Sequence, residues 1–159
     1  LFSFYTRGMS FIDMAYLKKS DLKNGIITYR RKKTGQQLTV KWEKCMEDII
    51  AKYGENTTTR YLLPIITNPC SDERIQYRNA ICRINVALKE VAGLAGLDIP
   101  LTMHVARHCW ASVAKSKNIP LSVISEGMGH DSEETTRIYL ASLDTSVVDK
   151  ANSLILKDF

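Results

Sequence analysis

Residues 101–140 read LTMHVARHCW ASVAKSKNIP LSVISEGMGH DSEETTRIYL, and this segment is the most informative part of the chain. It places His104 three residues before Arg107, and His130 nine residues before Tyr139. A phosphodiester is anionic, so a protein that cleaves it without a metal must first surround its oxygens with fixed cations and hydrogen-bond donors. Arginine binds phosphate through a planar fork, histidine supplies a donor or a base near neutral pH, and a tyrosine hydroxyl holds the phosphoryl group covalently. The segment therefore predicts phosphoryl transfer by a tyrosine nucleophile.

Three short motifs in this segment resemble those of the tyrosine recombinase, or phage-integrase, catalytic domain. They are HVARH at 104–108, MGH at 128–130 and TTRIY at 135–139, where family members read HxxRH, LGH and TTxxY at matching spacing. The resemblance covers nearly the whole chain. It implies an α+β fold that is mostly α-helical with a small antiparallel β-sheet. We expect residues 1–159 to be one catalytic domain, a fragment whose N-terminal DNA-binding domain and first catalytic-domain helix lie upstream.

The resemblance also implies a role for each motif residue. Tyr139 would be the nucleophile that forms a 3′-phosphotyrosyl bond to one DNA strand, and Arg107 would clamp the scissile phosphate. His130 would donate to a non-bridging oxygen. His104 would exchange a proton with the tyrosine or steady the phosphate, and His108 would have a structural role. The phosphodiester energy would be kept in the covalent linkage, so the resemblance implies no cofactor, metal or ATP.

One family residue is missing from its usual place. The family pattern is Gly-Leu/Met-Arg, and aligning Gly8 and Met9 with it puts Ser10 where the arginine belongs, with Asp13 in the place of the usual acid. Arg7 lies three residues earlier, which is about one helical turn. We expect its guanidinium to reach the same phosphate. The alternative is an enzyme that has lost this contact.

A basic hairpin is predicted near the N-terminus. β-Prone residues at 26–29 and 38–40 flank a Lys-Thr-Gly turn at 33–35. Seven basic residues and one acid, Asp21, fall within residues 18–33; the basic ones are Lys18, Lys19, Lys23, Arg30, Arg31, Lys32 and Lys33. Without the downstream motifs, such a cluster would equally fit a solvated face.

Within this hairpin, Lys33 sits where the family carries a lysine that protonates the departing 5′ oxygen. Strand alternation would send either Lys32 or Lys33 away from the site. We assign Arg30, Arg31 and Lys32 to DNA binding.

Apolar residues at helical spacing predict the other elements. The expected helices cover residues 2–17 (one or two helices around Gly8), 42–53, 73–94, 103 to about 117, and 147–156. Thr102 is the expected N-cap of the helix that begins at 103. A short helix is expected from Pro120 through Ile124, ending at 127–129, and Asp131 or Ser132 is expected to cap the helix that carries Tyr139.

Composition agrees with a polyanionic partner, which we take to be double-stranded DNA. Lys and Arg total 22 against 17 acids, a formal net charge of +5. The four cysteines form no CxxC pair and no zinc-like cluster, and we expect Cys82 and Cys109 to be buried free thiols. With no apolar run long enough to span a bilayer, these features fit a reducing cytoplasm.

We therefore expect the catalytic domain of a site-specific recombinase or integrase of a mobile element, which assembles into dimers or tetramers on DNA. Three alternatives stay open. A type IB topoisomerase would share the chemistry, although its family lacks this close motif spacing. A DNA-binding module with an inactive site is favoured only by Ser10. A small-molecule phosphodiesterase using the histidines is disfavoured by the basic hairpin.

Overall fold

The computed structural model describes residues 1–53, 59–98 and 100–141. The chain forms two compact units, Leu1–Trp110 and Ala111–Phe159, which are described separately below. Among the described residues, no helix has the length and apolar character needed to cross a membrane. The predicted segment 147–156 lies outside the described residues.

Two short helices open the first unit, α1 (Phe2–Tyr5) and α2 (Phe11–Ala15). Ser10 begins α2, because its Oγ accepts the N–H of Asp13 at 3.3 Å, and its hydroxyl donates to Asp13 Oδ2 at 2.6 Å. Asp13 is buried, and its other oxygen accepts the backbone N–H of Lys32 at 2.8 Å. The prediction of helices around Gly8 is confirmed, and Asp13 ties α2 to the basic hairpin.

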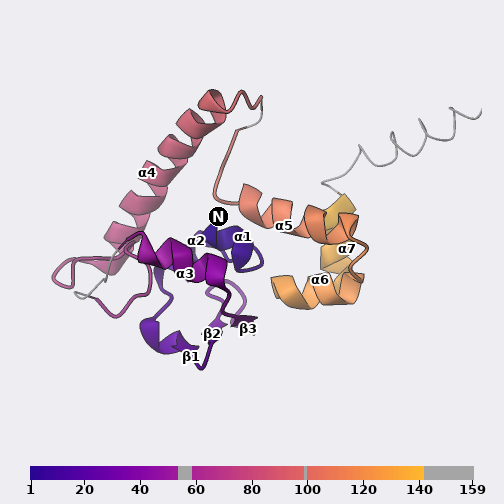
Figure 1. Cartoon of the computed structure of the whole chain (residues 1–159), viewed down its shortest axis with the longest axis horizontal. Helices are drawn as coiled ribbons and strands as arrows, with labels where there is room; N and C mark the ends of the chain where they lie inside the picture. Colours follow the sequence, from indigo (N-terminus) through magenta and orange to yellow (C-terminus); the bar gives the residue numbers. More distant parts are fainter. Residues whose placement is uncertain (54–58, 99, 142–159) are drawn as a thin grey trace, which may run out of the picture. The chain divides into compact units, whose positions relative to one another are not determined.

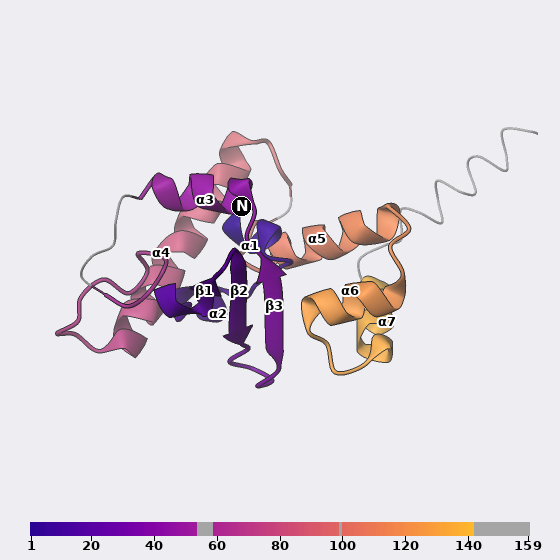
Figure 2. The ribbon, with the colours of Figure 1, turned by 60° about the horizontal axis from the view of Figure 1, so that its bottom comes forward.

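The hairpin belongs to a three-stranded antiparallel sheet of β1 (Leu22–Lys23), β2 (Ile26–Arg30) and β3 (Gln37–Lys41), in the order β1-β2-β3 (Figure 2). A short 3₁₀ turn, Lys19–Asp21, leads into it. Ile27 pairs with Val40 and Tyr29 pairs with Leu38, and all four are buried. Alternate residues of β2 and β3 thus face the core, as the period of two requires, and the predicted small sheet is confirmed.

Helices α3 (Lys44–Ala51) and α4 (Glu73–Leu94) complete most of this unit (Figure 1). The bounds of α4 agree with the prediction because both ends are marked in the sequence. Asp72 accepts the N–H of Ile75 at 2.9 Å, and Gly96 adopts a left-handed φ of 64°. The N–H groups of Gly96 and Leu97 bond back to Gly93 and Ala92, the paired bonds of a Schellman motif.

Helix α5 (Val105–Ser116) begins two residues later than predicted. Met103 and His104 form a turn instead, in which the Thr102 carbonyl accepts the N–H of Val105 at 3.1 Å. His104 therefore lies just before the helix.

Helices α6 (Leu121–Met128) and α7 (Glu133–Ala141) pack against each other in the second unit (Figure 1). α6 ends where predicted, at Gly129, whose φ is 64°. Ser132 caps α7 by accepting the N–H of Thr135 at 3.2 Å. The predicted Ser132 cap of the Tyr139 helix is thus confirmed.

The cysteine prediction is wrong in one respect. All four thiols are free, but Cys82 and Cys109 are exposed. The core side of α4 is set by residues such as Tyr77, Ala80 and Ala92, and Cys82 falls outside that stripe. An apolar neighbourhood in sequence does not identify the buried face of a helix.

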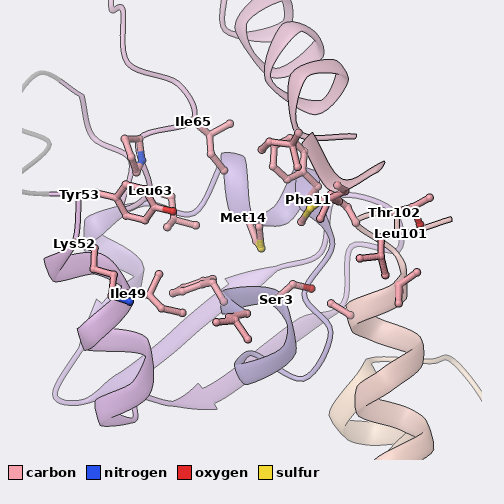
Figure 3. A pocket seen from close by; sticks show the side chains of 18 residues that line it. Ser3, Phe11, Met14, Ile49, Lys52, Tyr53, Leu63, Ile65, Leu101 and Thr102 are labelled. Carbon is pink, nitrogen blue, oxygen red and sulfur yellow. The ribbon is translucent and has the colours of Figure 1, made fainter. Parts of the chain in front are cut away.

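An apolar hollow of about 740 Å³ opens in the first unit. Figure 3 shows Met14, Ile49 and Leu63 among the side chains around it. Among the described residues that line it, Lys52 is the one charged side chain. This hollow is therefore poorly suited to an anionic substrate.

Candidate active site

Arg107 is a buried cation of the first unit with a backbone hydrogen-bond partner. Its side chain is 6% exposed, and Nη1 donates to the carbonyl of Gly8 at 3.0 Å. Gly8 has a φ of 78°, and a Cβ built on it would lie 2.7–2.8 Å from the Cγ, Cα and Cβ atoms of Arg107. Glycine is thus required twice here, for its backbone conformation and for the close approach of Arg107.

His104 and His108 share one side of the start of α5, as the i, i+4 rule predicts. Their ring centroids are 4.8 Å apart at an interplanar angle of 79°. Partial burial lowers the pKa of His104, and the charges of His108, Arg107 and Lys33 lower it further. Burial and then Arg107 lower the pKa of His108. Both imidazoles therefore favour the neutral form at pH 7, in which one ring nitrogen accepts a proton.

The structure separates the two candidate lysines. Both lie in the turn that joins β2 and β3, not in a strand. The Nζ atom of Lys32 lies over the Tyr16 ring, 4.8 Å from its centroid. Lys33 is exposed, and its charge acts on His104. Of the two, Lys33 is the lysine whose charge reaches His104.

The two arginines before this turn also differ. Arg30 is exposed, and its Nη1 donates to the Gly35 carbonyl at 2.7 Å. Arg31 is 8% exposed, because it continues the inward-facing alternation of Ile27 and Tyr29. Burial raises the pKa of Tyr29 to about 12, Asp13 adds to this, and the cations Arg31, Arg107 and Arg7 oppose it. The sequence-based assignment of Arg31 to DNA binding, together with Arg30 and Lys32, missed its burial, which period-two alternation from Ile27 would have indicated.

Arg7 is partly buried and has a left-handed φ of 59°, which is uncommon outside glycine. Its Nη1 donates to the Thr39 carbonyl at 3.3 Å, so its side chain is directed to β3. Arg7 also lies close enough to Tyr29 to act on its pKa, as Arg107 does. Ser10, at the aligned position of the family arginine, serves instead as the cap of α2.

A smaller hollow of about 280 Å³ lies beside these groups. Gly8, Ser10, His104 and Arg107 all contribute to its lining. The first unit thus brings a buried arginine and a histidine of lowered pKa to the wall of one small cavity, which suits an anion.

The second unit holds His130 and Tyr139 together. The N–H of Gly129 bonds to the Glu126 carbonyl and that of His130 to the Ser125 carbonyl, both at 3.0 Å, so a Schellman motif fixes the backbone of His130. Its ring lies edge-on to that of Tyr139, with centroids 5.6 Å apart at 71°. Its Nδ1 is hydrogen-bonded to Thr136 Oγ1 at 2.8 Å. The sequence reasoning missed this threonine, although it lies one turn before Tyr139 on α7.

The chain belongs to the phage integrase family, whose family model matches residues 4–146. No curated protein matches the sequence. Among solved structures, the XerA recombinase is similar with a TM-score of 0.68 and 21% identity over 96% of this chain and 55% of that one. The XerH site-specific recombinase in a post-cleavage complex with a palindromic difH substrate has a TM-score of 0.58 and 19% identity, and the match covers 96% of this chain and 45% of that one. A lambda integrase dimer bound to a COC′ core site has a TM-score of 0.58 and 17% identity, and the match covers 87% of this chain and 49% of that one.

These comparisons confirm the predicted fold, a mostly helical tyrosine recombinase catalytic domain with a small antiparallel sheet. The chain spans about half the length of the solved proteins it matches, with 55%, 45% and 49% of their lengths covered.

We predict that Gly8→Ala destabilises the protein more than Gly25→Ala. Both glycines have a left-handed φ, 78° and 72°, but only the Gly8 Cβ would meet other atoms, those of Arg107. Each variant loses about 1 kcal/mol to backbone strain, and Gly8→Ala a further ~1–3 kcal/mol to overpacking. Denaturant unfolding measures both, and equal losses would show that Arg107 does not press on Gly8.

We also predict that Lys33→Met raises the pKa of His104. Removing a nearby positive charge favours the protonated imidazole of His104, and the pKa of His108, which burial and Arg107 lower, should rise less. NMR titration of the ring protons gives both values, and Lys32→Met is the matched control. An unchanged His104 in Lys33→Met would place Lys33 away from the site.

Proposed function

We propose that this chain is the catalytic part of a site-specific DNA recombinase, which cleaves and rejoins strands through a covalent 3′-phosphotyrosyl intermediate. The observation that carries the proposal is the pairing of Tyr139 with His130 on adjacent elements of the second unit. Membership of the phage integrase family supports it, and so does the set of Arg107, His104 and Lys33 in the first unit.

In the proposed reaction, the Tyr139 hydroxyl attacks the scissile phosphorus, and the bond from phosphorus to the 5′ oxygen breaks. Arg107, Arg7 and His130 hold the non-bridging oxygens, where developing charge is best stabilised by donors fixed in advance. His104 accepts the tyrosine proton, a role that its lowered pKa supports. Lys33 gives a proton to the departing 5′ oxygen. Religation reverses these transfers, and the mechanism uses no metal, ATP or other cofactor.

Double-stranded DNA is the proposed partner, contacted through its phosphates by Arg30, Arg31 and Lys32 and by the general basic excess of the chain. Exchange between two duplexes needs more than one active site, so we propose assembly into dimers or tetramers on DNA. XerH is described bound to its difH substrate, and lambda integrase as a dimer on a core site. The departure at Ser10 favours integration or excision of a mobile element over resolution of chromosome dimers.

A second candidate is a DNA-binding module of the same fold with an impaired site. It is favoured by one observation, that Ser10 caps α2 where the family arginine is expected. Such a module would bind DNA without cleaving it, and the following experiment distinguishes it from an active recombinase.

We predict that the protein forms a denaturation-resistant adduct with a nicked suicide substrate carrying a candidate attachment site. Tyr139→Phe should abolish the adduct, because the phenyl ring has no hydroxyl to attack phosphorus. Tyr53→Phe, at an exposed tyrosine in the turn that follows α3, is the matched control and should retain the adduct. Gel electrophoresis after denaturation measures the covalent product.

An adduct that persists in Tyr139→Phe would place the nucleophile elsewhere. Tight DNA binding with no adduct in the parent protein would favour the impaired module.

We further predict that Arg7→Ala lowers the single-turnover cleavage rate at saturating DNA by about 10²-fold or more, because removing one preorganised donor to the transition state reduces the rate by about that factor. Saturating DNA removes effects on binding from the rate. Arg74→Ala, at an exposed arginine in the first turn of α4, is the control. An unchanged rate in Arg7→Ala would mean that Arg7 has only a structural role, through its hydrogen bond to the Thr39 carbonyl.

A further inference from the structure

The two threonines of the TTRIY motif have different surroundings. Thr135 is exposed, and its Oγ1 is 3.0 Å from Oγ of Ser132, the residue that caps α7. Thr136 is fully buried at 0% exposure, and its Oγ1 is 2.8 Å from Nδ1 of His130. Only the second threonine therefore touches the proposed site.

The partner of Nδ1 decides what the other ring nitrogen of His130 does. A neutral imidazole has one N–H donor and one acceptor nitrogen. A carboxylate or carbonyl partner would draw the proton to Nδ1 and leave Nε2 as an acceptor, which repels a phosphate oxygen. A hydroxyl can donate as well as accept, so, unlike those partners, it also allows Nδ1 to accept while the proton stays on Nε2.

The surroundings also restrict how the ring of His130 turns. Its backbone N–H donates to the Ser125 carbonyl, and its ring contacts the ring of Tyr139. Its Nδ1 is hydrogen-bonded to Thr136 Oγ1. Both Thr136 and Tyr139 belong to α7, so the contact also joins His130 to the helix that carries the proposed nucleophile.

We propose that Thr136 is a positioning residue, whose hydroxyl donates to Nδ1 of His130 and holds the imidazole in the tautomer that carries its proton on Nε2. The consequence for catalysis rests on the function proposed above: the Nε2–H group is then the donor to the non-bridging oxygen. Thr136 itself touches neither the phosphate nor the attacking oxygen.

The first test determines the tautomer of His130 in the absence of DNA. The chain has three histidines, so long-range ¹H–¹⁵N spectra of the labelled protein contain three imidazoles, assigned with His104→Gln and His108→Gln. We expect neutral His130 to be protonated on Nε2 in the parent protein and in Thr136→Ser. In Thr136→Val, which keeps the shape but not the hydroxyl, the form protonated on Nδ1 should appear. Thr135→Val is the matched control and should resemble the parent.

The second test measures adduct formation by the same variants. Thr136→Val should lower the single-turnover rate by about tenfold, the value of one net hydrogen bond, with unchanged DNA affinity. Thr136→Ser should restore the rate, which a loss of packing alone would not explain. Thermal unfolding of each variant verifies that the fold is retained.

A parent His130 protonated on Nδ1, or a Thr136→Val protein with the parent tautomer and rate, would overturn the proposal. If the parent forms no adduct but its tautomer changes in Thr136→Val as expected, the positioning contact stands and the recombinase function is rejected. The two failures are therefore distinguishable.

Discussion

The hydrogen bond from the Arg107 guanidinium to the Gly8 carbonyl is the constraint on which the first unit depends. It spans 99 residues of sequence and brings the HVARH segment against the turn between α1 and α2. A buried guanidinium is stable only when its donors are satisfied, and the Gly8 carbonyl satisfies one of them at 3.0 Å. This contact also explains why a residue without a side chain stands at position 8.

Other groups of the first unit are placed around this anchor. Asp13 joins α2 to the hairpin turn, and that turn places Lys33 where its charge reaches His104. Arg107 is thus anchored on α5 by its hydrogen bond to Gly8, whereas Lys33 lies in the turn between β2 and β3. A donor that is held in place before a substrate binds stabilises developing charge better than a free one. In the second unit, the Schellman turn at Gly129 fixes the backbone of His130, and the cap at Ser132 begins the helix that carries Tyr139.

The sequence predicted those features that local chemistry determines. The bounds of α4 and the end of α6 follow from a cap or a left-handed glycine, and the hairpin follows from its β-prone runs. Membership of the phage integrase family was predictable because the motifs carry fixed spacings.

Features that depend on tertiary contacts were not predictable in the same way. The exposure of Cys82 depends on which face of α4 meets the core. Helix α5 begins after a turn at Met103 and His104, which helical periodicity does not indicate. The direction of Arg7 depends on β3, whose Thr39 carbonyl accepts its hydrogen bond. The contact between Thr136 and His130 links two elements across a loop, and neither residue alone indicates it.

In the proposed reaction, the cations of the first unit act on the same phosphodiester that Tyr139 attacks. Cleavage of a substrate with sulfur in place of the scissile 5′ bridging oxygen tests it most directly, because a thiolate leaves without a proton. We predict that Lys33→Met cleaves the ordinary substrate slowly and the sulfur substrate at the parent rate, while Arg107→Ala is slow on both. A Lys33→Met protein that is equally slow on both substrates, or as fast as the parent on the ordinary one, would contradict the proposed role of Lys33.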